Sequence, residues 1–264
     1  MVTDPALLEK IALGEKAAEH DWTLKRRAEI KNITDETALS ELVASEKNPL
    51  LQTAAADRLA DLRDTAARNL AASRADAVGK ITDQALLLKI AWEDEEPVVR
   101  RAAVENLTDQ AALAKIAFEN SAVPARIAAA ARLTDQAQLA KIVIEDKEWG
   151  VRYAAIRGIR DQGLLVTIAE RTGFTPAIER LTDQAVLARI ALGHPNMVPR
   201  EAAVRTLTDQ SVLAKIVVEE RWWPLRKLAM MKLTDLALLE KIAEGNENWE
   251  VKDFARARLR QLRR

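Results

Sequence analysis

The feature that most constrains the fold of this chain is a phrase that recurs along it: Leu-Thr-Asp-Gln, a short apolar run, and then Lys-Ile. The phrase begins at Ile81, Leu107, Leu133, Leu181 and Leu207, and degraded copies begin at Val2, Ile33, Leu59, Ile159 and Leu233. Most of these apolar anchors are 26 residues apart. A period of this length indicates an array of repeats, in which each unit is one small structural element stacked on the next.

Each repeat encodes two short helices, as the copy at 81–106 illustrates. Thr82 or Asp83 can cap the first helix, and the apolar residues at 86, 87, 90 and 91 give it a stripe at helical spacing. An acidic turn follows, and Pro97 suits the first turn of a second helix with its own apolar face. Helices of about ten residues are too short to be stable alone, so the hairpins must stack. We therefore expect an all-α fold, a right-handed α-solenoid (superhelix) of about nine to ten short helix hairpins.

The second helices open on a recurrent Val-Arg-x-Ala-Ala pattern, at residues 99–103 and 151–155. On this pattern the chain resembles the HEAT and armadillo repeat families over nearly its whole length. Units of those families typically run about 40–47 residues, and the shorter units here look like a compact bacterial HEAT-like variant. The chain is also similar to the variant leucine-rich repeat proteins, but the iron–sulfur module of that family needs cysteines, which this chain lacks. The resemblance implies a long binding surface and no dedicated catalytic pocket.

The repeat predicts a single domain over residues 1–264. Residues 1–32 and 233–264 have the character of capping repeats, because the first carries extra residues and the last is strongly basic. Two repeats, 59–80 and 159–180, are four residues short and degenerate. The second of them has glycines, and a proline close to where its second helix should begin, which predicts a weak helix. Such a helix would bend the array or act as a hinge; the alternative is a tolerated degenerate repeat.

Composition narrows the classes of function. Lys plus Arg equals Asp plus Glu at 40 each, so no net field attracts the chain to nucleic acid or to an anionic membrane. The absence of cysteine excludes disulfides, thiolate metal sites and cysteine nucleophiles. The N-terminal residues enter the first repeat without the pattern of a signal peptide, and no apolar run is long enough to cross a bilayer. We expect a soluble cytoplasmic protein with no membrane partner.

Two ladders of charged residues run through the repeats. Seven positions before the anchors lie Arg100, Arg126, Arg152, Arg200 and Arg226. Two positions after the anchors lie Asp83, Asp109, Asp135, Asp183 and Asp209. The resemblance to HEAT-like repeats implies that an arginine at this phase bonds acidic or carbonyl groups of its own and adjoining units. The one-to-one stoichiometry with the aspartates fits a structural ladder of charge-assisted hydrogen bonds. The alternative is an exposed arginine stripe that binds phosphates.

Three tryptophans, Trp149, Trp223 and Trp249, occupy one phase just ahead of the second helix of their repeats. A large apolar residue at this place can staple the start of a helix to its neighbour, so we expect them to pack between repeats. Trp222 does not occupy this phase, and the rings of the consecutive residues Trp222 and Trp223 cannot easily both be buried on the same side. We expect one ring of the Trp222–Trp223 pair to be exposed and available to a partner or a base.

The candidate binding surface lies where the repeats disagree with one another. Residues six and two positions before each anchor should face away from the core, toward the inner, concave curve of a solenoid. There Ile127, Ala131 and Tyr153 form an apolar patch. The candidate surface consists of this patch together with Arg101, Arg132, Arg157, Arg205, Trp222 and Trp223. The alternative is ordinary sequence drift on a surface that tolerates it.

No motif in the sequence predicts catalysis. The two histidines, His20 and His194, fall in predicted loops of different repeats, so a shared metal site or a histidine dyad is not expected. There is no glycine-rich phosphate loop, no Gly-x-Ser-x-Gly elbow and no His-Glu-x-x-His helix. We therefore expect no catalytic residue, no cofactor and no metal.

These observations favour a non-catalytic scaffold or adaptor that binds another protein or a peptide on its concave face. One alternative follows from similarity to HEAT-like DNA glycosylases, which use a basic concave face. It is nucleic-acid binding or DNA repair through Arg100, Arg126, Arg152 and the Trp222–Trp223 pair. A third hypothesis, a HEAT-like lyase subunit acting on a bilin chromophore, rests on fold analogy alone.

Overall fold

The computed structural model describes residues 22–245 and 248–263, and every regular element within these ranges is a helix. The chain divides into two compact units, Met1–Ala77 and Val78–Arg264. The single domain expected from the repeat is thus two units, which are described in turn. Most of the expected N-terminal capping repeat, residues 1–21, lies outside the described residues.

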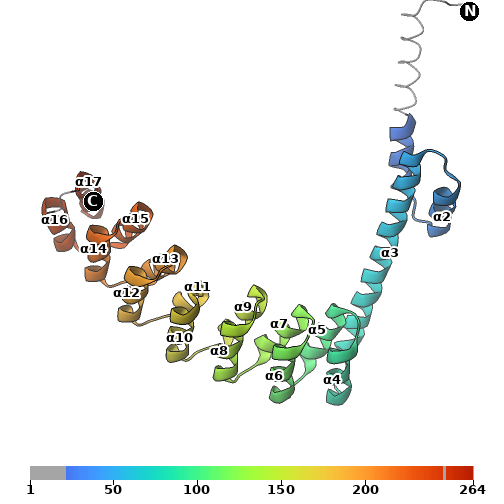
Figure 1. Ribbon diagram of the computed structural model, residues 1–264, viewed down its shortest axis with the longest axis horizontal. Coiled ribbons are helices and arrows are strands. Elements are labelled where there is room, and N and C mark those ends of the chain that lie inside the picture. The colour runs from blue at the N-terminus through green and yellow to red at the C-terminus, as the bar shows by residue number, and fades with distance from the viewer. Residues whose placement is uncertain (1–21, 246–247, 264) are drawn as a thin grey trace, which may run out of the picture. The chain divides into compact units, whose positions relative to one another are not determined.

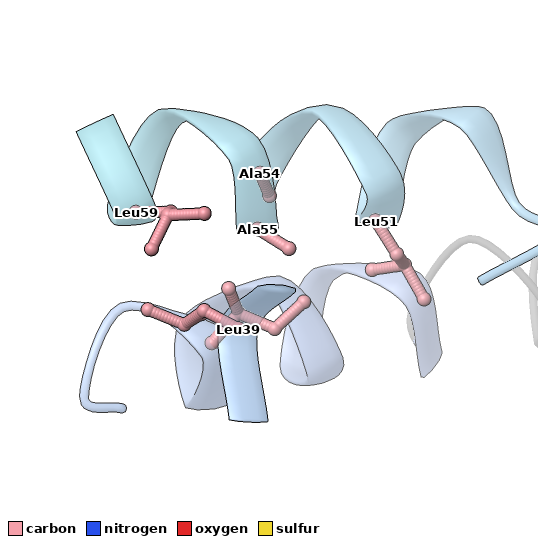
Figure 2. Close-up of a cluster of buried hydrophobic side chains, with 6 residues drawn as sticks. Leu39, Leu51, Ala54, Ala55 and Leu59 are labelled. Atoms are coloured by element: carbon pink, nitrogen blue, oxygen red, sulfur yellow. The ribbon is translucent and has the colours of Figure 1, made fainter. Parts of the chain in front are cut away.

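The described part of the first unit contains a helix over residues 22–30, α2 (Glu36–Ser45) and α3 (Pro49–Val78). Asp35 caps α2, because its carboxylate accepts hydrogen bonds from the N–H groups of residues 37 and 38 at 2.8 and 3.2 Å. Leu39 of α2 faces Leu51 and Ala55 of α3, and all three are completely buried (Figure 2). Ile30 of the first helix completes this small hydrophobic core.

A single 30-residue helix, α3, takes the place of the short repeat expected at 59–80. Residues 59–78 continue the helix that begins at Pro49 without a break. This segment has no proline or glycine before Gly79, and it is rich in alanine, leucine and arginine, which are strong helix formers. Because no helix-breaking residue places a turn there, the prediction of a hairpin at 59–80 was wrong.

The second unit is a succession of helix hairpins, each packed on the next. In chain order its helices are α4 (Gln84–Glu93), α5 (Pro97–Asn106), α6 (Gln110–Glu119), α7 (Val123–Arg132), α8 (Gln136–Glu145), α9 (Trp149–Gly158), α10 (Gln162–Thr172), α11 (Thr175–Ile178), α12 (Gln184–Gly193), α13 (Met197–Thr206), α14 (Gln210–Glu219), α15 (Trp223–Lys232), α16 (Leu236–Gly245) and α17 (Trp249–Leu262). Within a hairpin the two helices pack together, as α4 does with α5. Between hairpins, second helices pack on second helices, as in the series α5, α7 and α9 (Figure 1).

The repeated phrase combines a buried anchor with a helix cap. The anchor Leu207 is completely buried. Asp209, two positions on, caps α14 by accepting from the N–H groups of Ser211 and Val212 at 2.8 and 3.1 Å. Hydrogen bonds from the Ser211 hydroxyl and from the Val212 N–H lower the pKa of Asp209. Because the folded-state pKa is depressed, this cap stabilises the fold above the unfolded-state pKa, and the contribution is lost as the pH falls through the folded-state pKa.

The glutamine of the phrase joins each hairpin to the next one. In α4, the Gln84 Oε1 atom accepts from the Thr108 N–H at 2.9 Å and from the Thr108 hydroxyl at 3.1 Å. The Gln84 Nε2 group donates to the carbonyl of Asn106 at 3.2 Å. The bonds to threonine recur at Gln110–Thr134, Gln162–Thr182, Gln184–Thr208 and Gln210–Thr234. The threonine and glutamine of the phrase therefore form a hydrogen bond between successive repeats. The sequence pattern did not reveal this role.

Gln136→Ala is expected to weaken the contact between two hairpins. Gln136 Nε2 donates to the Gly158 carbonyl at 3.0 Å, and Gln136 Oε1 accepts from the N–H groups of Arg160 and Asp161 at 2.6 and 3.4 Å. Because these bonds are only partly shielded from water, the free energy of unfolding should fall by about 1–2 kcal/mol in urea denaturation. Gln138→Ala, in the same turn of α8, should change it by less than about 0.5 kcal/mol. Equal losses in the two variants would contradict the role of Gln136.

The short repeat at 159–180 keeps only one turn of its second helix, α11. Gly173 ends α10 in the left-handed conformation, with a φ of 63°. A Cβ atom at this position would lie 2.8 Å from the Cγ atom of Pro199. Both the backbone conformation and the close approach of Pro199 therefore call for glycine, and the chain turns here after α10 rather than starting a full second helix.

Candidate interaction surface

Residues six and two positions before each anchor lie on the side of the second helices that faces away from the core. In the second unit they are exposed or half-buried, whereas residues four positions before the anchors, such as Ala155, are completely buried. We call this side the second-helix face. It includes Arg101, Glu105, Ile127, Ala131, Tyr153, Arg157, Glu201, Arg205, Lys227, Met231, Asp253 and Ala257.

A stacked aromatic pair occupies the second-helix face at α9. The ring centroids of Trp149 and Tyr153 are 4.8 Å apart, and the ring planes differ by 13°. Trp149 is 60% exposed and Tyr153 is 42% exposed. The two residues are four positions apart on one helix, so they share one side of it. Their stacking leaves a continuous aromatic area open to solvent.

The prediction that the three tryptophans pack between repeats holds in part for Trp223, whose ring contacts Phe254 of the next hairpin. It does not hold for Trp149, which stacks on Tyr153 of its own helix. Trp223 is 38% exposed and Trp249 is 70% exposed. The residue that anchors the start of α9 in the core is Val151, which is completely buried. Two positions along a helix correspond to about 200° of rotation, so a tryptophan two residues before Val151 points outward. The four-residue spacing of Trp149 and Tyr153 was the sequence signal that could have shown this.

Ile127 extends the aromatic pair onto the preceding second helix, α7. Ile127 is half-buried, and a Cβ atom on Gly150 would lie only 3.1 Å from its Cδ1 atom. The absence of a side chain at Gly150 thus lets the two helices approach closely. Ala131, one turn further along α7, is exposed and small. The apolar residues predicted from the sequence therefore share one face, and Trp149 adds an exposed indole ring to it.

The arginines around this patch differ in whether a carboxylate neutralises them. Arg101 pairs with Glu105 at 2.7 Å, and Arg205 lies 3.6 Å from Glu201. Arg157 is exposed, one turn beyond the aromatic pair, and takes part in no ion pair within the described ranges. The patch therefore combines exposed aromatic rings with two arginines, Arg132 and Arg157, that no carboxylate of the described residues neutralises.

Arg132 is exposed and also joins two hairpins. Its Nε and Nη2 groups donate to the carbonyl of Leu107 at 3.2 and 2.9 Å. Lys232 occupies the same place in a later repeat and donates to the carbonyl of Arg205. Burial lowers the pKa of Lys232. Arg132 is exposed, so its contribution to binding stays a prediction, but part of its guanidinium is engaged by the preceding hairpin.

The two charged ladders do not pair with each other. Asp83, Asp109, Asp135, Asp183 and Asp209 each cap the first helix of their own hairpin. Arg126 pairs with Asp146 at 3.1 Å, and Arg200 pairs with Glu220, in both cases in the loop of the next hairpin. Arg100, Arg152 and Arg226 donate to the Ser121 hydroxyl and to the carbonyls of Val143 and Glu220 respectively.

The ladder arginines thus bond acidic groups of the adjoining hairpin or carbonyls of their own hairpin, and the geometry of a hairpin explains why the aspartate series is not their partner. The arginines stand at the start of the second helix, while the aspartates cap the start of the first helix. In an antiparallel hairpin these are opposite ends, and a ten-residue helix is about 15 Å long. The arginines therefore bond to the loop between helices, whose acidic residues lie within reach.

Trp222 and Trp223 differ in exposure. Trp222 is half-buried, and its N–H donates to the Glu220 carboxylate at 2.9 Å. Trp223 is the exposed member of the pair and contacts Phe254 edge-on, with 6.0 Å between ring centroids. The second-helix face thus carries a second aromatic cluster at α15 and α17.

Within residues 22–245 and 248–263, no group of three or more His, Asp or Glu side chains could hold a metal ion. His194 instead accepts a hydrogen bond from the Asn196 N–H at 3.1 Å, and His20 lies outside these ranges. No helix of the described part is long and apolar enough to span a membrane. Comparison with protein-family models gave no match, and a search among curated proteins found no significant relative.

Proposed function

We propose that the chain is a non-catalytic scaffold, a HEAT-like α-solenoid that binds a protein or peptide partner on its second-helix face. Two features support the repeat class. Each hairpin of the second unit packs on the next in chain order, and the same Thr–Gln hydrogen bond recurs between hairpins. Repeat proteins of this kind bind partners along an extended face, because stacking leaves one side of every unit uncovered.

The observation that carries the proposal is the exposed stack of Trp149 on Tyr153. Tryptophan and tyrosine are frequent anchors of protein interfaces, since they bury a large area at a low cost in side-chain entropy. Here both are fixed on one helix, with Ile127 beside them and Arg157 one turn further. This arrangement suits an apolar side chain of a partner that is followed by an acidic residue.

The contacts of the ladder arginines favour a protein partner over a nucleic acid. Nucleic-acid binding needs arginines and lysines that are free to neutralise phosphates. Arg126 instead pairs with Asp146 and is only 15% exposed, and Arg152 donates to the Val143 carbonyl at 2.9 Å. Nucleic-acid binding is therefore the alternative, which a titration with DNA distinguishes from protein binding.

Peptides selected from a random display library against the whole chain test the proposal. The selected peptides should lose about 30-fold or more in affinity for Trp149→Ala and for Tyr153→Ala, since an interface anchor contributes about 2 kcal/mol or more. Fluorescence polarisation of labelled peptides measures the affinity. Leu86→Ala is the matched control, because Leu86 is 43% exposed on α4, the first helix of its hairpin. The affinity of this variant for the peptides should be unchanged.

Equal affinity of the selected peptides for the wild-type chain and for both aromatic variants would overturn the choice of surface. Circular dichroism of each variant verifies that the helices are intact. Labelled DNA, double- and single-stranded, is titrated at two salt concentrations in parallel. Tight binding that weakens steeply with salt would replace the protein-binding proposal with the nucleic-acid one.

A further inference from the structure

The second aromatic cluster of the second-helix face lines a groove between α15 and α17. Trp223 of α15 meets Phe254 of α17 edge-on, with 89° between the ring planes. Trp249, the first residue of α17, is 70% exposed. The groove has a volume of about 460 Å³ and is lined by Trp223, Trp249, Glu250, Asp253, Phe254 and Ala257. Three of its six lining residues are therefore aromatic, and both ionisable ones are carboxylates.

The charges in this groove favour a cation. Glu250 and Asp253 contribute two carboxylate groups, and none of the described lining residues is basic. The Asp253 carboxylate contacts Arg256 at 3.5 Å, but both side chains are more than half exposed, so this pair is weak and replaceable. The faces of tryptophan rings also attract cations, because the aromatic quadrupole places negative charge above the ring.

We infer that this groove binds an arginine side chain of the partner. The inference rests on the proposed function in one respect, namely that the arginine belongs to the protein or peptide bound on the second-helix face. A guanidinium is planar, so it stacks on an indole ring while its fork of N–H groups donates to a carboxylate. The ammonium group of lysine is a compact point charge and lacks that fork, so arginine matches the rings and carboxylates of the groove better.

The groove and the Trp149–Tyr153 pair would contact different parts of one partner. The pair lies on α9 and the groove begins at α15, with the second helices α11 and α13 between them. Packed helices are 8–10 Å apart, so the two sites are separated by roughly 30 Å. The partner segment is thus expected to carry an acidic residue near one end, facing Arg157, and an arginine near the other.

A small arginine probe tests the groove directly. N-acetylarginine amide would be titrated into the whole chain with isotope-labelled tryptophans, and the indole N–H signals followed by NMR. Saturable shifts are expected at Trp223 and Trp249, with a Kd on the order of 1–10 mM, and no shift is expected at Trp149. N-acetylcitrulline amide has the same shape without the charge and should bind about tenfold more weakly.

Two variants complete the test. Glu250→Gln/Asp253→Asn changes only exposed side chains and should abolish the preference for arginine over citrulline. Leu86→Ala, at an exposed residue of α4 outside both aromatic clusters, is the matched control and should bind the probe as the wild type does. The inference would be overturned by the absence of any shift at Trp223 and Trp249, by equal binding of arginine and citrulline, or by unchanged arginine preference in the double variant. Because the probe needs no partner, this result is independent of the peptide selection, and either hypothesis can fail while the other stands.

Discussion

Arg200→Met is expected to lower the free energy of unfolding by about 3–5 kcal/mol, because it leaves a buried carboxylate without its cation. Arg200 lies on α13 and pairs with Glu220 in the loop of the next hairpin, and the two side chains are only 16% and 8% exposed. The Arg200 Nε group also donates to the Ala191 carbonyl at 2.8 Å. The residue thus links its own hairpin to the next one at a place that water hardly reaches.

Urea unfolding followed by circular dichroism measures this loss. Arg205→Met makes the same substitution on the same helix and is the control. The Arg205 side chain is 64% exposed and lies 3.6 Å from Glu201, so its loss should stay below about 1 kcal/mol. A loss as large for Arg205→Met as for Arg200→Met would show that burial of the ion pair is not the cause.

The double variant Arg200→Met/Glu220→Gln separates the buried charge from the packing. A neutral amide at position 220 can still accept the hydrogen bond that the Trp222 N–H donates at 2.9 Å, and it removes the unpaired charge. Most of the stability lost in Arg200→Met should therefore return. A double variant no more stable than Arg200→Met would mean that the lost packing of the arginine, and not the uncompensated carboxylate, dominates.

The regular part of the fold could be predicted because several signals repeat together in the sequence. The anchors Leu107 and Leu207 are buried as the apolar stripe requires, and the aspartates two positions later cap helices as their phase suggests. The break in the repeat was harder to predict, because a segment four residues short can form a smaller hairpin or no hairpin. At 59–78 the absence of any glycine or proline decided the outcome in favour of one long helix.

The candidate surface could be predicted only in part, since spacing gives the side of a helix but not the partner of a side chain. Ile127 and Tyr153 lie on the expected face for this reason. Trp149 was misplaced because its role was inferred from residue type and not from its angle to Val151. The bond from Arg132 to the Leu107 carbonyl was not predicted, because the sequence does not reveal that a long guanidinium on the edge of a face can bond to a neighbouring carbonyl.

Leu207→Ala is the second substitution with a large expected effect, a loss of about 2–5 kcal/mol in the free energy of unfolding. Leu207 is completely buried between the end of α13 and the start of α14. Its N–H donates to the Ala203 carbonyl at 2.8 Å, a bond that alanine keeps. The loss therefore measures the cavity left by the missing side chain. Leu86→Ala, at a leucine that is 43% exposed, should cost less than about 1 kcal/mol.

The position of the damage in Leu207→Ala tests whether the second unit is an array of nearest-neighbour repeats. In such an array, stability is close to a sum of terms for single repeats and for the contacts between adjacent ones. Amide hydrogen exchange should then show a loss of protection from α12 to α15, the two hairpins that meet at Leu207, with nearly unchanged protection from α4 to α7. A uniform loss across all of these helices would mean that the second unit opens as one cooperative body, and the solenoid proposal would lose its main energetic consequence.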